Sequence, residues 1–175
     1  AARHRDQGRA VLAAAAAGRA AAETSMHTEA ATLFGAAAEI AAAGVDAVAG
    51  RRLALEQAES LRRAGDPRHV DIVWDVAHRA TVAADREARA LAAIALCKLG
   101  PLTVAGTLDP ATAEYVEDAL AASTDPALRA RCASQATLFY SMSGNVERCR
   151  ELFDVALTAA RQTDNPVILL DALGS

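Results

Sequence analysis

Aromatic side chains recur about every 40 residues along this chain, and that period limits the folds it can adopt. Four of the six aromatic residues take part, namely Phe34, Trp74, Tyr115 and Phe153. Three of them lie in the pattern small-x-x-x-aromatic-x-x-Ala, whose members share one face of a helix. The copy at Tyr115 is the weakest, because Asp118 stands where the final alanine is expected. A repeat of this length predicts stacked helix pairs, and we expect each aromatic to pack into the next pair.

Capping residues, prolines and glycines mark the helix boundaries. Alanine forms about a quarter of the chain, favours helices and lets them approach closely. An Asp or Asn stands before Pro at four predicted helix starts, namely Asp66-Pro67, Asp109-Pro110, Asp125-Pro126 and Asn165-Pro166. Glycines that follow apolar-periodic runs predict helix ends at Gly44, Gly65, Gly100 and Gly144. The predicted helices are 5–22, 27–43, 47–64, 67–84, 86–99, 110–123, 126–143, 145–163 and 166–173.

These boundaries predict an all-α fold of eight or nine helices. Short connections between helices of similar length favour antiparallel neighbours. We expect one repeat domain over residues 1–175, with repeats at about 5–43, 47–84, 86–123 and 126–163 and a further helix from 166. The longer Pro101–Asp109 loop interrupts the third repeat, so a bend in the stack is expected there.

Charge and cysteine content argue against several classes of protein. The net charge of −4 is spread as mixed signs, and no basic stripe reaches the density of a nucleic-acid footprint. The three cysteines are odd in number and widely spaced, which predicts buried thiols in a reducing compartment and hence a cytoplasmic protein. No apolar run has the length of a membrane span.

No constellation of catalytic or metal-binding residues stands out. The stretch Gly44–Arg51 has the glycines of a phosphate loop in outline, but it lacks the Gly-Lys-Ser/Thr ending and a preceding strand. The four histidines lie far apart, and none has a cysteine at metal-ligand spacing. Acidic pairs such as Glu56 and Glu59 lack an enclosing pocket that would separate their pKa values. We therefore predict no catalytic residue, no metal and no cofactor, and a binding protein instead of an enzyme.

Binding is expected on the concave face of the stack, which the first helix of each pair lines. Counting back from the turn glycines places charged and hydroxyl side chains on that face. They could hold a peptide, a small effector or a neighbouring domain, and the alternative is ordinary solvated surface. The candidates are Arg52, Glu59, Arg62, Glu87, Lys98, Arg131, Ser134 and Ser141.

The helix that follows each glycine-centred turn resembles the second helix of a tetratricopeptide repeat (TPR). Tyr140 and Gly144 match the first-helix aromatic and the turn glycine of that repeat. Ala133 and Ala136 depart from it, since they stand at its Trp and Leu positions, and the period is nearer 40 than the usual 34. The resemblance implies a right-handed TPR-like α-solenoid.

From about Thr28 onward the chain also resembles the helical-repeat region of large actinobacterial ATP-binding regulators of the LuxR type and related signalling ATPases. The stretches that carry this resemblance are 54–80, 86–100 and 125–166. It implies a longer chain with an N-terminal ATPase, a middle repeat array that senses an inducer or partner, and often a C-terminal helix-turn-helix domain. No ATPase or DNA-reading motif lies within these 175 residues.

The expected function is the non-catalytic sensor or interaction region of such a transcriptional regulator. Its partners would be a peptide, an effector, or the regulator's own ATPase and DNA-binding domains. A stand-alone TPR-like scaffold with a generic peptide groove is the alternative, and an all-α enzyme with an unrecognised site is a third. The chain lacks an initial Met and ends on the apolar turn 167–173, so we expect a fragment whose C-terminal end is open to self-association.

Overall fold

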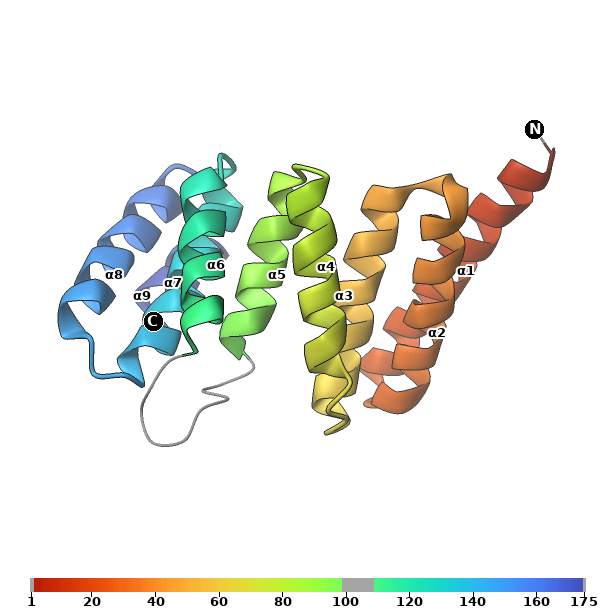
Figure 1. Ribbon diagram of the computed structural model, residues 1–175, viewed down its shortest axis with the longest axis horizontal. Coiled ribbons are helices and arrows are strands. Elements are labelled where there is room, and N and C mark those ends of the chain that lie inside the picture. The colour runs from red at the N-terminus through yellow and green to blue at the C-terminus, as the bar shows by residue number, and fades with distance from the viewer. Residues whose placement is uncertain (1, 99–108, 175) are drawn as a thin grey trace. The chain divides into compact units, whose positions relative to one another are not determined.

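A computed structural model describes residues 2–98 and 109–174. This part contains nine α-helices, one short π-helix and no strand, which confirms the all-α prediction (Figure 1). The helices are α1 (Ala2–Glu23), α2 (His27–Ile40), the π-helix η1 (Ala41–Val45), α3 (Ala47–Arg63), α4 (His69–Val82), α5 (Arg86–Lys98), α6 (Pro110–Ala122), α7 (Pro126–Ser141), α8 (Val146–Arg161) and α9 (Pro166–Leu173).

Three of the four predicted capping sites start a helix. Asp109, Asp125 and Asn165 each accept a hydrogen bond from a backbone N–H of the following turn. A proline follows each of them at the start of the helix, where its missing N–H leaves no intrahelical bond unmade. Local capping chemistry therefore fixes where α6, α7 and α9 begin.

The fourth predicted start is wrong, because α4 begins at His69 and not at Pro67. The carboxylate of Asp66 accepts the backbone N–H of Arg68 at 3.0 Å and also pairs with its guanidinium. Residues 67–68 form a turn that leads directly into α4, and the N–H of Val70 donates to the carbonyl oxygen of Pro67 at 3.2 Å. Asp66 thus accepts the N–H two residues later, as Asn165 does before α9, but the segment that follows Asp66 starts as a turn and becomes regular helix at His69.

Backbone with positive φ recurs at the repeat length. After the first helix of a predicted pair it occurs at Ser25, Gly65 and Gly144, which are 40 and 79 residues apart. After the second helix it occurs at Gly44, Ala84 and Asp164, which are 40 and 80 residues apart. A left-handed residue just past a helix lets the following N–H groups bond the last carbonyls. The turn role predicted for Gly65 and Gly144 is confirmed, and the period is visible in backbone geometry as well as in sequence.

The copy around Tyr115 departs from this pattern in its backbone too. Its second helix, α6, ends on Ser123 with φ −73° and ψ 122°, which is extended and not left-handed. Gly100 and most of the loop expected at Pro101–Asp109 lie outside the described residues.

The chain divides into two compact units, residues 1–88 and 89–175. In the first unit, α2 contacts both α1 and α3, and α3 contacts α4. Phe34 is 2% exposed, and a Cβ placed on Gly18 would lie 2.9 Å from the Cε1 atom of its ring. A glycine on α1 therefore makes room for the ring on α2. This contact lies within the first predicted pair, whereas we expected the aromatic to pack against the next one.

The other repeat aromatics are only half-buried, namely Trp74, Tyr115 and Phe153. A residue next to each of them in sequence is the fully buried one, namely Val73, Val116 and Leu152, at 1%, 0% and 0% exposure. Successive helical residues point about 100° apart, and on these three helices the aliphatic neighbour is turned more fully into the core than the aromatic. These three aromatics mark the repeat, but their aliphatic neighbours fill the interior, whereas Phe34 is itself buried.

In the second unit, α7 is the central element and contacts α6, α8 and α9. Its residues Cys132, Ala133 and Ala136 are completely buried. Small side chains at these positions let neighbouring helices approach closely. The ring of Phe139 packs edge-on against Tyr140 with centroids 5.4 Å apart. The grouping of both units into one repeat domain, and its solenoid geometry, stay predictions.

Candidate binding groove

A cavity of about 410 Å³ lies along α7 in the second unit. Arg131, Ser134, Gln135 and Leu138 line it from α7. Their spacing is i, i+3, i+4 and i+7, which forms one stripe along a helix. The volume lies in the range of roughly 300–1,000 Å³ that is typical of ligand sites.

Helices α5 and α9 supply the other walls of this cavity, which we call the α5–α7–α9 groove. Ile94 and Lys98 come from α5, one helical turn apart. Leu170, Asp171 and Gly174 come from α9 and its C-cap. Because Asn165 caps α9 and α9 packs on both α7 and α8, the short helix presents these residues at a defined place.

Three of the eight predicted binding residues meet in this groove, namely Lys98, Arg131 and Ser134. Lys98 and Arg131 are exposed, and within the described ranges neither forms an ion pair. The sequence reasoning missed Gln135 and Leu138, although their spacing from Arg131 was a readable signal. Nothing local to α9 indicated that Leu170 and Asp171 would lie opposite.

Ser134 is the most unusual residue of the groove. It is 4% exposed, and its Oγ has no hydrogen-bond partner in the part of the chain that the structure describes. Thr137 on the same helix, 6% exposed, donates its hydroxyl to the carbonyl oxygen of Ala133 at 2.9 Å. A buried hydroxyl without a partner costs about 1–3 kcal/mol. The groove therefore contains an unsatisfied donor in a nearly dry position.

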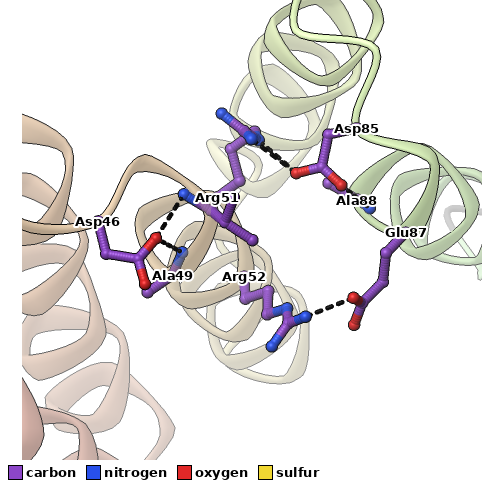
Figure 2. A network of polar contacts seen from close by, with 8 residues as sticks. Asp46, Ala49, Arg51, Arg52, Asp85, Glu87 and Ala88 are labelled. Atoms are coloured by element: carbon purple, nitrogen blue, oxygen red, sulfur yellow. Dashed lines mark hydrogen bonds and ion pairs between the residues drawn. The ribbon is translucent and has the colours of Figure 1, made fainter.

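Four of the predicted residues pair with one another in the first unit. Arg52 of α3 forms an ion pair with Glu87 at the start of α5, as Figure 2 shows. Arg62 donates to Glu59 at 2.9 Å within α3. Residues paired in this way have less capacity to hold a ligand. The eighth candidate, Ser141, donates its hydroxyl to the carbonyl of Leu138 at the end of α7.

Next to Arg52 is a second, more buried ion pair. Arg51 donates to Asp85 at 2.9 and 2.6 Å, and the two side chains are 11% and 10% exposed. The other carboxylate oxygen of Asp85 accepts the N–H of Ala88 in the first turn of α5 (Figure 2). Burial alone would raise the pKa of Asp85, but the Ala88 N–H and the Arg51 guanidinium hold this pKa below its ordinary value. Asp85 thus ties α3 to the start of α5.

A polar network in the second unit links α6 to α8. Arg148 donates its Nε to Glu117 at 2.8 Å and pairs with Glu151 on its own helix. The side-chain hydrogen bond to Glu117 is the main reason that the pKa of Arg148 is raised. Burial and a hydrogen bond to Glu117 raise the pKa of Tyr140. The network connects α6 to α8, and its single guanidinium is shared between two carboxylates.

The thiols lie in or beside the same core. Cys97 and Cys132 are buried, Cys149 is half-buried, and all three are free cysteines. Burial, together with the charge of Glu117, raises the pKa of Cys132 to about 12. The prediction of buried thiols is confirmed for Cys97 and Cys132. Cys149 instead lines a surface groove beside Phe153.

No group of three or more His, Cys, Asp or Glu side chains in the described ranges could hold a metal ion. Across residues 2–98 and 109–174, no helix combines the length and apolar character that crossing a membrane requires.

Comparison with protein-family models, with curated proteins and with solved structures found no match for this chain. The TPR-like and LuxR-type resemblances therefore stay predictions from the sequence.

Proposed function

We propose that this chain is a non-catalytic binding module and that the α5–α7–α9 groove is its ligand site. One observation carries the proposal. Lys98, Arg131 and Ser134 line one cavity from two helices, and none of them has a protein partner among the described residues. The polar candidates of the first unit are committed to one another, as Arg52 is to Glu87.

The module fits the sensor region of a larger regulator of the LuxR type. The resemblance from Thr28 onward and the 40-residue recurrence of positive φ support this proposal. A ligand that touches α5, α7 and α9 together binds best to one arrangement of these helices. It would therefore shift the population toward that arrangement. In a regulator, such a shift is the signal that an adjoining output domain could read.

The experiment is a peptide-display selection on the purified 175-residue protein, followed by a binding assay on two matched variants. Gln135→Trp fills the α5–α7–α9 groove, and Gln162→Trp fills a separate cavity of about 370 Å³ along α8. We expect selected peptides to bind the wild type and Gln162→Trp but not Gln135→Trp. Equal binding to both variants, or no selected peptide at all, would overturn the proposal.

Absence of catalysis is tested separately by measuring phosphate release from ATP. We expect none above buffer for the purified protein. Turnover that follows the protein through purification and disappears in Lys98→Gln would show that the groove is a catalytic site.

A further inference from the structure

We infer that the α5–α7–α9 groove selects a peptide segment in which a single carboxylate stands next to a bulky apolar side chain. This inference rests on the proposed function and deepens it, since it assigns the chemistry of the ligand. Three features of the groove carry it: an unsatisfied hydroxyl, an excess of one positive charge, and two exposed leucines.

The hydroxyl of Ser134 has no hydrogen-bond partner among residues 2–98 and 109–174. Four other helical hydroxyls donate to the carbonyl four residues earlier, namely those of Thr32, Ser60, Thr81 and Thr137. Ser134 does not, although it is more than nine-tenths buried and lines the cavity. A ligand oxygen in the groove would accept this hydrogen bond and remove the cost of the unpaired group.

The charges of the lining select an anion with one negative charge. Lys98 and Arg131 bring two positive charges, and Asp171 brings one negative charge. The net charge of +1 is neutralised by one carboxylate, whereas a phosphate dianion would leave an excess negative charge facing Asp171. Arg131 and Ser134 are three residues apart on α7, so a single carboxylate can meet both a guanidinium and a hydroxyl. Hydrogen bonds between charged groups are roughly twice as strong as neutral ones.

Two leucines, one on each side of the groove, are the reason to expect an apolar side chain in the ligand. Leu138 of α7 is 46% exposed and Leu170 of α9 is 66% exposed, and both line the cavity. Ile94 of α5, 4% exposed, also lines the cavity and belongs to the core of the second unit. An apolar side chain adjacent to the carboxylate would cover these surfaces. Because the leucines are open to solvent, the groove can admit a segment of an extended chain.

The test uses fluorescein-labelled peptides with Gly/Ser flanks and a variable two-residue core, measured by fluorescence anisotropy against the purified protein. We expect the Glu-Leu core to bind at least about tenfold more tightly than Gln-Leu or Glu-Ala, since tenfold corresponds to about one charge-assisted hydrogen bond. The affinity for Glu-Leu should fall as salt is raised. A phosphoserine-Leu core should bind no more tightly than Glu-Leu, and free N-acetylglutamate should bind far more weakly.

Protein variants distinguish binding in the groove from a nonspecific effect of the protein's positive charges. Arg131→Gln should reduce binding of Glu-Leu to the level of Gln-Leu and leave Gln-Leu unchanged. Arg129→Gln, on the same helix but lining the other cavity, should have no effect. Ser134→Ala should weaken Glu-Leu binding by about tenfold without lowering thermal stability, because it removes an unsatisfied buried group.

The outcomes distinguish this inference from the proposed function. If Glu-Leu and Gln-Leu bind equally and Gln135→Trp abolishes both, the groove binds peptides but the charge assignment is wrong. Tighter binding of phosphoserine-Leu also overturns the charge assignment. Both the inference and the proposed function fail if two results coincide. Neither peptide core binds, and no peptide from the display selection loses its binding to the Gln135→Trp variant.

Discussion

Replacing Leu152 with alanine should destabilise the second unit far more than replacing the adjacent Phe153. Leu152 has 0% exposure and belongs to the core around α7. Truncation of a buried leucine to alanine leaves a cavity and costs about 2–5 kcal/mol. Phe153 is half-buried and lines an open surface groove of about 420 Å³ with Val146 and Cys149. Full burial of such a side chain is worth about 1.5–3 kcal/mol. With part of that area already in water and no sealed cavity left behind, we expect Phe153→Ala to cost about 1–2 kcal/mol.

The assay is urea denaturation followed by circular dichroism at the helical band, with the two variants measured in parallel. The fluorescence of Trp74, the only tryptophan, reports on the first unit and serves as an internal reference. Leu152→Ala should shift the dichroism midpoint by more than twice the shift of Phe153→Ala. If Phe153→Ala costs as much as Leu152→Ala, the aromatic is the core residue of the repeat and the burial argument is wrong.

Three further predictions follow from the charges and thiols. Asp85→Asn should lower the free energy of unfolding by about 1.5–3 kcal/mol at neutral pH. Because the pKa of Asp85 is lower in the folded state, its contribution is complete above about pH 4 and is lost as the pH falls, so the variant should lose stability less steeply in acid denaturation. A carboxyl-detected NMR titration should place the pKa of Asp66 at about 2, mainly because of its hydrogen bonds from the side chain and backbone of Arg68. Ellman's reagent should label Cys149 in the folded protein, while Cys97 and Cys132 react only in denaturant, because burial raises the pKa of both thiols. Rapid labelling of all three in the native state would contradict that assignment.

Helix positions were largely predictable because local chemistry determines them. Capping side chains and prolines fixed the starts of α6, α7 and α9, and glycine fixed the turns at Gly65 and Gly144. The start of α4 was not predictable by the same rule. Asp66 accepts the N–H of Arg68 as a cap would, but residues 67–68 form a turn, and a cap motif alone does not show where a turn becomes regular helix.

The binding residues were only partly predictable, because pairing depends on contacts between distant segments. Nothing in the local sequence around Arg52 indicates that Glu87, 35 residues away, will neutralise it. Lys98, Arg131 and Ser134, which were predicted to lie on one face, line one cavity, and their role in binding stays a prediction. The contribution of α9 to that cavity could not be predicted from the sequence, because only tertiary packing brings Leu170 and Asp171 beside α7.

Ser134 is a position where helix propensity and core packing would both favour a different residue from the one present. Its helix is packed on several sides, and its neighbours Ala133 and Ala136 are small, apolar and completely buried. An alanine at position 134 would satisfy both the helix propensity and the packing, and it would avoid an unpaired hydroxyl. Sequences usually agree with their fold at every level, and departures concentrate at functional sites. A buried serine that has no partner among the described residues, one turn from an arginine without an ion pair in the same ranges, is such a departure, and a ligand oxygen in the groove is the partner that would resolve it.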